Sequence, residues 1–163
     1  MCDTNDGRYR QLRTSDGMLR CLMTSTRVTD LTRSLEELDG LVSEEPDETD
    51  TIMVQRIYAL RKKPLGILSD DEVRLAVSQR VGSPFILDLA FQRLEQEPLL
   101  DADCYPGDLL SALIRSNDDF WEGRPHLRLQ LADLYAYAMA QPMDMTDSFR
   151  ESLGLPVNDW LPS

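Results

Sequence analysis

The feature that most constrains the fold is a series of short apolar stripes at helical spacing, each closed by proline or glycine. From residue 28 onward, apolar residues recur every three or four positions, which is the period of one helix face. Proline cannot continue a helix interior and glycine commonly ends a helix, so each stripe is limited to a few turns. No run alternates between apolar and polar residues over more than a few positions. The sequence therefore predicts an all-α fold, a single compact domain of six to seven short helices.

Capping residues, prolines and glycines set approximate boundaries for these helices. Ser69 followed by Glu72 fits a capping box, in which each side chain accepts a hydrogen bond from the other residue's backbone N–H. Ser83 and Pro84 suit the N-cap and first position of the next helix, whose many apolar residues predict the deepest burial. In chain order, the predicted helices lie near Asp30–Leu38, over about 49–63, from Ser69 to Gly82, from Ser83 to Pro98, from Pro106 onward, from Pro125 to Pro142, and over about 146–153.

The charge distribution divides the chain into two parts. The 163 residues include 29 Asp and Glu against 17 Lys and Arg, for a net charge of -12 at pH 7. Residues 1–27 carry five arginines and three aspartates, so residues 28–163 hold a net charge of -14. The opening segment is polar and without a sustained apolar period, which predicts a loosely held basic arm, with Met23 as an alternative start. Residues 28–163 are predicted to form the helical domain, with Trp160 docking its tail.

The excess of acid restricts the partners. An acidic surface repels phosphate backbones and anionic lipid, which argues against direct binding of nucleic acid or membrane, and a basic protein is the natural complement. Between Asp39 and Asp50 six acids occur without a base, which is typical of a solvated loop. No stretch reaches the roughly 18–20 apolar residues of a membrane span, and the opening residues hold no signal-peptide core. Because Cys2, Cys21 and Cys104 are few and far apart, the chain is predicted to be cytoplasmic with reduced thiols.

Few residues suggest chemistry. His126 is the sole histidine and follows Pro125, where an exposed or local packing role is expected. Neither a zinc-ligand spacing, a nucleophile motif nor a glycine-rich phosphate loop occurs in the sequence. Close carboxylates such as Asp101 and Asp103 could serve as an acid–base pair, but a solvated surface is the simpler interpretation. We therefore predict no catalytic, cofactor-binding or metal-binding residues, and no enzyme activity.

Two stretches carry more information than composition does. The first is Leu60-Arg61-Lys62-Lys63-Pro64-Leu65, followed by Asp71-Glu72-Val73-Arg74-Leu75 with Gln79. The second is Pro98-Leu99, then Tyr105-Pro106-Gly107-Asp108-Leu109-Leu110. By their physical chemistry the first is a helix end with a proline stop and the second a turn that leads into a helix. A structural role is the simpler interpretation of both, and contact with a partner is the alternative.

With Arg33-Ser34-Leu35-Glu36-Glu37-Leu38 and the acidic loop before them, these motifs resemble, in order and spacing, the helical immunity proteins of bacterial contact-dependent growth inhibition (CDI) systems. The resemblance covers about residues 30–122. It implies a cytoplasmic protein without catalysis that binds the C-terminal toxin domain delivered by a neighbouring cell. Many such toxins are nucleases, which need basic surfaces, so an acidic inhibitor could occlude the active site or a region beside it.

Under this interpretation, toxin contacts are expected at acidic rims near helix ends. The predicted residues are Asp70, Asp71, Asp101, Asp103, Asp118, Asp119 and Glu122. An acidic helical adaptor for another basic protein is the main alternative, and an enzyme built on the carboxylate pairs is a second. A DNA-binding regulator is disfavoured, because the helix over 84–97 carries Arg93 against three acids.

Overall fold

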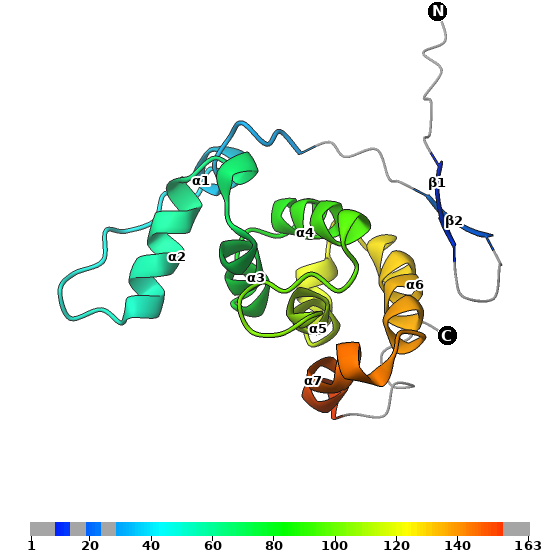
Figure 1. Cartoon of the computed structure of the whole chain (residues 1–163). Coiled ribbons are helices and arrows are strands. Elements are labelled where there is room, and N and C mark those ends of the chain that lie inside the picture. The colour runs from blue at the N-terminus through cyan, green and yellow to red at the C-terminus, as the bar shows by residue number, and fades with distance from the viewer. Residues whose placement is uncertain (1–8, 14–18, 24–28, 155–163) are drawn as a thin grey trace, which may run out of the picture.

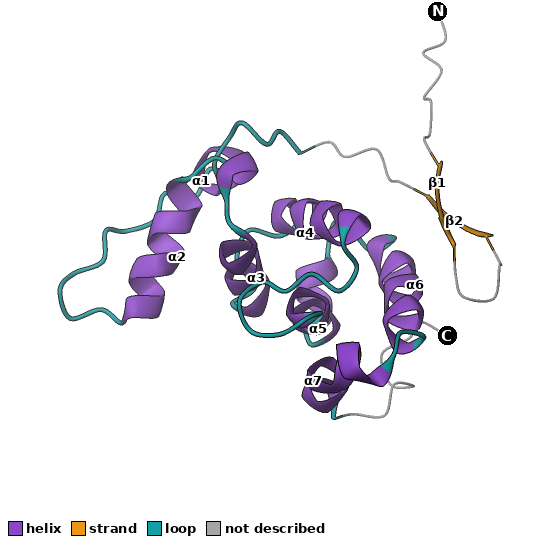
Figure 2. Ribbon diagram, in the orientation of Figure 1, coloured by secondary structure: helices purple, strands orange, loops and turns teal. Residues whose placement is uncertain are grey.

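The computed structural model describes residues 9–13, 19–23 and 29–154. Within these ranges the helices match the predicted all-α class, and Figures 1 and 2 show them as short segments joined by loops. Their bounds are α1 Leu35–Asp39, α2 Ile52–Lys62, η1 Leu65–Ile67, α3 Asp70–Ser78, α4 Phe85–Gln96, α5 Asp108–Ile114, η2 Asp118–Trp121, α6 Leu127–Met139 and α7 Met143–Leu153, where η marks a 3-10 helix. The prediction of six to seven short α-helices is confirmed.

The opening segment contains a feature that the sequence analysis did not predict. Strands β1 (Tyr9–Arg13) and β2 (Leu19–Met23) pair in antiparallel fashion, with Tyr9 opposite Met23 and Arg13 opposite Leu19. The sequence between them contains Asp16-Gly17, a dipeptide favoured in tight hairpin turns, which is the signal that could have revealed the pair. The loosely held arm and the boundary at residue 28 stay predictions, and the expected docking of Trp160 lies outside the described residues.

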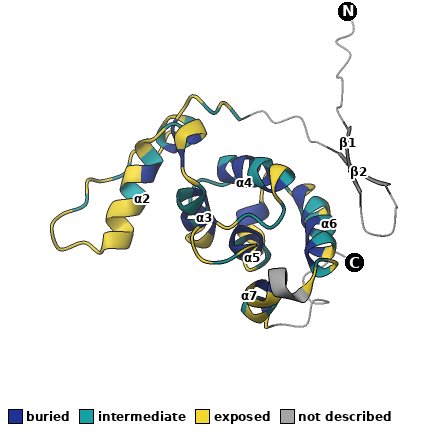
Figure 3. Cartoon of the chain, in the orientation of Figure 1, coloured by how far each residue is buried: buried dark blue, intermediate teal, exposed yellow. Residues whose placement is uncertain are grey.

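The core lies where α3, α4, α5 and α6 meet. α3 packs against both α4 and α5, and α6 and α7 each pack against α5 (Figure 1). α4 contributes most to this core, as its apolar density predicted, and Figure 3 shows one of its faces buried. Phe91 of α4 meets Trp121 of η2 edge-on, with ring centroids 6.1 Å apart, a geometry that suits the opposed charges of ring face and ring edge.

Several helix ends differ from the sequence-based boundaries. The capping box of α3 is confirmed, because Ser69 Oγ accepts from the Glu72 N–H at 3.2 Å and Glu72 accepts from the Ser69 N–H at 3.0 Å. Ser83 is not the N-cap of α4, since Pro84 occupies that position and the Ser83 hydroxyl donates to the Phe120 carbonyl. The remaining starts also fall later than predicted, at Leu35 for α1, Asp108 for α5 and Leu127 for α6, whereas α7 starts earlier, at Met143.

One local contact and one tertiary contact fix the turn that follows α3. The helix stops at Ser78, and the Val81 N–H then donates to the Ala76 carbonyl at 2.8 Å. Gly82 has φ +76°, and a Cβ placed there would lie 2.5 Å from Leu35 Cδ2. Both the backbone conformation and the closeness of Leu35 therefore require glycine at this turn.

Candidate partner-binding surface

The basic run Arg61-Lys62-Lys63 at the end of α2 is bound within the protein. Arg61 donates through Nη2 to Asp39 Oδ2 at 3.0 Å and to the Leu41 carbonyl at 2.8 Å, and through Nε to Ser43 Oγ at 2.7 Å. Lys62 Nζ lies 3.7 Å from Glu36 and 4.6 Å from the centre of the Tyr58 ring. These contacts tie the start of the acidic loop and α1 to the last turn of α2.

The third base of the run links α2 to α3. Lys63 Nζ donates to Glu72 Oε1 at 2.6 Å. Although burial raises the pKa of Glu72, the hydrogen bonds from Lys63 and Ser69 outweigh it, so the pKa is lowered overall. The carboxylate therefore stays charged while it serves both the capping box and the ion pair.

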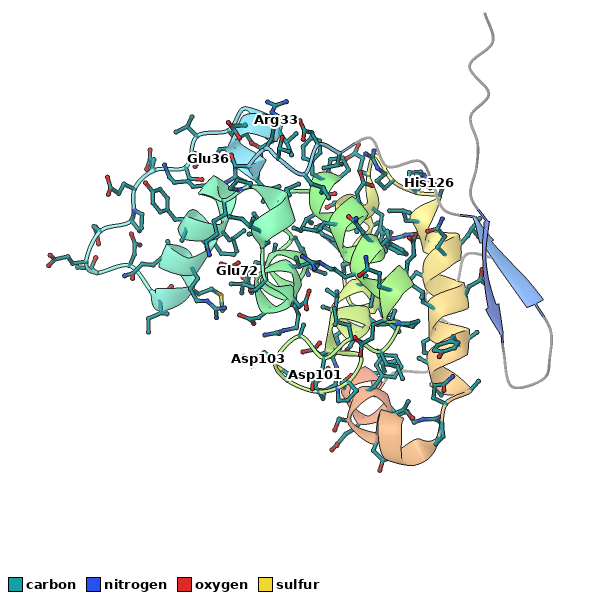
Figure 4. The ribbon with its side chains drawn as sticks, turned by 45° about the horizontal axis from the view of Figure 1, so that its top comes forward. Arg33, Glu36, Glu72, Asp101, Asp103 and His126 are labelled. Atoms are coloured by element: carbon teal, nitrogen blue, oxygen red, sulfur yellow. The ribbon has the colours of Figure 1, made fainter. Side chains whose placement is uncertain are left out.

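The Pro64-Leu65 step continues this anchoring. Pro64 pairs with Ser34 in an isolated bridge, and the Leu65 N–H donates to the Arg33 carbonyl at 3.0 Å. The next amide, of Gly66, donates to the Leu31 carbonyl at 2.8 Å. Arg33 and Glu36 lie near each other at the top of the molecule in Figure 4. The first motif is thus a structural clamp between α1, α2 and α3, in agreement with the simpler interpretation of the sequence.

Asp108 gives the second motif its structural purpose. Its carboxylate is 3% exposed and accepts from the backbone N–H groups of Ala102 at 2.9 Å and Cys104 at 3.0 Å. Arg74 Nε lies 3.5 Å from the same carboxylate. Gly107 has φ +87°, and a Cβ there would come within 3.0 Å of the Phe149 ring. The Tyr-Pro-Gly-Asp sequence therefore folds the loop before α5 onto α3 and α7.

The seven predicted contact acids occupy two separate places. The first four lie at the start of α3 and in the loop before α5, and Figure 4 shows Asp101 and Asp103 together in that loop. The last three lie in or just after η2, beyond the far end of α5, a helix about 10 Å long. The structure therefore brings the acids together as two groups. The first is Asp70, Asp71, Asp101 and Asp103, and the second is Asp118, Asp119 and Glu122.

Ion pairing within the protein differs among these acids. Asp71 contacts Arg56 and lies 3.1 Å from Arg74, while Asp70 lies 3.5 Å from Arg93. Of the second group, Asp118 pairs with Arg128, but its side chain is 89% exposed. Asp101 accepts from the Asp103 N–H at 3.0 Å, and Asp119 lies 3.5 Å from Asn117. Asp103, Asp119 and Glu122 are the acids of the seven that present the least engaged carboxylates.

A small cavity between α3 and α5 adds a basic feature that sequence reasoning missed. Its volume is about 290 Å³, and three arginines line it together with serines and Tyr105. Arg74 reaches Asp108 from this wall, whereas Arg80 and Arg115 form no ion pair with any described residue. Helix α3 and helix α5 are separated by about 30 residues, so only their packing reveals the cavity. Its chemistry suits a single anionic group.

Most of the large apolar side chains that are exposed in the described residues lie elsewhere, on residues 40–56, which we call the projecting segment. It comprises the acidic loop and the first turns of α2, and Figure 3 shows it extending from the core with most of its residues exposed. Leu41, Val42 and Ile52 are 65%, 82% and 76% exposed. Sequence reasoning classed this loop as a solvated linker and overlooked the apolar residues at its two ends.

One further buried charge serves the fold. Asp88 in α4 is 5% exposed and accepts from Arg124 Nε at 2.7 Å and Nη2 at 2.9 Å, and Thr29 also donates to it. The hydrogen bond to Asp88 raises the pKa of Arg124, so the guanidinium stays charged. This pair joins α4 to the turn before α6.

Among the described residues, no group of three or more His, Cys, Asp or Glu side chains is arranged to hold a metal ion. None of the helices in the described ranges is both long and apolar enough to cross a membrane.

His126 is exposed at the N-terminus of α6, on the opposite side from Asp101 and Asp103 in Figure 4. Cys104 carries a free, exposed thiol. Where a carboxyl pKa in this part of the chain departs from its ordinary value, hydrogen bonding lowers it.

Together these features describe a helical protein with internal ion-pair clamps and exposed acidic and apolar surface. Comparison with models of known protein families identifies the family. The family model of CDI immunity proteins matches residues 37–131, more than half of the chain. The chain therefore belongs to the CDI immunity protein family, as the motifs indicated. Neither the curated proteins nor the solved structures gave a match.

Proposed function

We propose that this protein binds and neutralises the toxin domain of its own CDI system, and that this toxin is a basic nuclease whose active-site surface it covers. The match to the CDI immunity family carries the proposal, since members are named for protection against such toxins. The protein works in the cytoplasm as a stoichiometric inhibitor and performs no catalysis of its own.

The charge of the molecule supports a basic partner. Residues 28–163 have a net charge of -14, and the bases that do occur at the end of α2 are held in internal ion pairs. The negative potential is therefore left on the outside, where it speeds encounter with a positively charged surface. A nuclease needs such a surface to hold phosphate, so an acidic cover over it would exclude the substrate.

The two acidic groups around α3 and η2 are proposed contact sites. Asp101 and Asp103 stand in an exposed loop, and Asp118 and Asp119 stand on η2. Because α5 separates the two groups, a toxin domain that contacts both would cover the intervening face. A toxin that contacts one group could be blocked beside its active site.

Co-expression with the C-terminal domain of the large secreted protein encoded directly upstream tests this function. Rescue of growth and co-purification as a stable complex are expected, and the association rate should fall steeply with added salt because the charges lose their range. Failure of both rescue and co-purification overturns the immunity function and favours the acidic adaptor. A flat salt response removes the electrostatic part alone.

A further inference from the structure

We infer that the projecting segment, residues 40–56, is the principal toxin-docking surface, with exposed apolar side chains as anchors and carboxylates between them. The inference rests on the proposed function and goes beyond it, because it assigns the contact to a part of the molecule that charge alone did not select. The expected occupant is a basic face of the toxin domain that also offers an apolar recess.

The apolar exposure is concentrated in this segment. Five of the seven large hydrophobic side chains that are exposed in the described residues lie here, namely Leu41, Val42, Ile52, Met53 and Val54. A concentration of exposed apolar side chains in one projecting segment is typical of interaction sites. Ile67 and Leu129 are the remaining two, and they lie on η1 and α6.

Acidic side chains lie between the two sets of anchors along the chain. Glu44, Glu45 and Glu48 are exposed and form no hydrogen bond or ion pair with any described residue. The hydroxyl and backbone N–H of Thr49 lower the pKa of Asp47, so this carboxyl also stays charged. Between Gly40 and Thr51 the loop contains no base. Apolar side chains at both ends of an acidic loop fit a partner that offers apolar recesses next to basic side chains.

The segment is also held in shape before any partner arrives. Thr51 Oγ1 caps α2 by accepting from the Val54 N–H at 3.3 Å, and Gln55 Nε2 donates to the Asp50 carbonyl at 3.1 Å. At the other end of the loop, Arg61 holds Leu41 and the Ser43 N–H donates to Glu36 at 3.0 Å. A surface ordered in advance loses less entropy on binding than a free loop does.

The same charges argue against other occupants. A symmetric contact between two copies of this chain would bring the acidic loops together, and like charges across an interface are costly. Nucleic acid and anionic lipid would be repelled for the same reason. The basic toxin face is the occupant that uses both the apolar anchors and the carboxylates.

Matched double variants in the full-length chain test the anchors. Val42→Ser with Ile52→Ser should weaken binding to the upstream-encoded toxin domain by at least about tenfold, because two exposed anchors are lost. Ile67→Ser with Leu129→Ser removes a similar amount of exposed apolar surface elsewhere and should change affinity by less than about twofold. Isothermal titration calorimetry supplies the affinities, and circular dichroism checks that both variants are folded.

Two matched triple variants, each of which removes three carboxylates, test the role of the acidic loop. Glu44→Gln, Glu45→Gln and Glu48→Gln together should slow association and flatten its salt dependence. Glu97→Gln, Asp147→Asn and Glu151→Gln remove the same number of exposed carboxylates from α4's end and α7 and should have a smaller effect. Stopped-flow mixing at two salt concentrations measures both.

The outcomes separate this inference from the proposed function. If the unchanged protein neither binds nor protects against the toxin, the proposed function itself fails. If it protects while the Val42/Ile52 and Glu44/Glu45/Glu48 variants bind with unchanged affinity, the docking surface is wrong and the function stands. A change in oligomeric state without loss of toxin binding, seen by light scattering, assigns the segment to self-association and also overturns the inference.

Discussion

The two ends of α2 differ sharply in burial and in ion pairing. At the C-terminal end, Leu60 is fully buried and Arg61, Lys62 and Lys63 each pair with an acid of another segment. At the N-terminal end, Ile52 and Met53 face solvent next to a loop in which Glu44, Glu45 and Glu48 form no ion pair with any described residue. One helix therefore has an end that builds the fold and an end that is available to a partner.

This difference teaches how an acidic protein uses its few bases. The bases of the first motif neutralise acids that the fold needs, at Asp39, Glu36 and Glu72. Exposed acids such as Glu44 and Glu48, which form no ion pair with any described residue, remain on the exterior. Net charge alone does not distinguish the acids that are paired within the protein from the exposed acids that are not. The first set stabilises the fold, whereas the second is available to a partner.

The largest effect on stability is expected for truncation at the buried end. Leu60→Ala should lower the free energy of unfolding by about 3 kcal/mol, because Leu60 is 0% exposed and the change leaves a cavity. Ile52→Ala, at the 76% exposed end, should cost less than about 0.5 kcal/mol. Urea denaturation of both variants measures the contrast, and equal losses would show that the two ends are not distinct.

Removal of the Asp108 carboxylate should have the next largest effect. Asp108→Ala leaves the Ala102 and Cys104 N–H groups without their acceptor and removes an ion-pair partner of Arg74, for an expected cost of about 2 kcal/mol. The exposed Asp103→Ala change in the same loop is the control. Thermal unfolding compares them, and a neutral Asp108→Ala would mean that the loop holds its fold without this clamp.

A smaller effect is expected at the junction between the two ends. Arg61 and Asp39 are 12% and 16% exposed, so Arg61→Gln should cost about 1 kcal/mol. It should also speed hydrogen exchange at the amides of residues 41–43, which Arg61 helps to hold. Arg56→Gln breaks a more exposed pair with Asp71 and serves as the control, with a smaller loss expected in both measurements.

The smallest effect is expected from acidification. Hydrogen bonds from the Ser43 N–H and the Ser34 N–H lower the pKa values of Glu36 and Glu37, respectively. A pKa lowered by folding adds stability that is present above the ordinary carboxyl pKa and lost as the pH falls through it, at about pH 4 and below. The urea concentration at the midpoint of unfolding, measured from pH 7 to pH 3, should decrease below about pH 4. The decrease should be less steep in Glu36→Gln. A rise instead would show that relief of charge repulsion dominates.

Local sequence signals predicted the elements better than their ends. The Ser69/Glu72 capping box lies where expected, since both partners are three residues apart in the chain. Ser83 was misassigned because its hydroxyl finds the Phe120 carbonyl, a contact across 37 residues. The Asp16-Gly17 dipeptide, in contrast, is a local signal in the sequence that favours a tight turn between β1 and β2.

The candidate site was less predictable for the same reason. A carboxylate at Asp71 has the same chemistry in the sequence as one at Glu48, but packing places Arg56 and Arg74 beside the first. Likewise, the sequence does not distinguish Leu60, fully buried, from Ile52, largely exposed, because both lie in one helix. The cavity between α3 and α5 depends on residues far apart in the chain.

The sequence by itself determined the helical class, the capping of α3, the acidic character and the family motifs, because each depends on residue type and short-range spacing. Only the tertiary structure decided which charges are neutralised within the protein and which apolar side chains remain in water. Those properties depend on contacts between distant segments, such as Arg61 with Asp39 and Asp108 with Arg74. The division of α2 into an anchored end and a projecting end follows from these contacts.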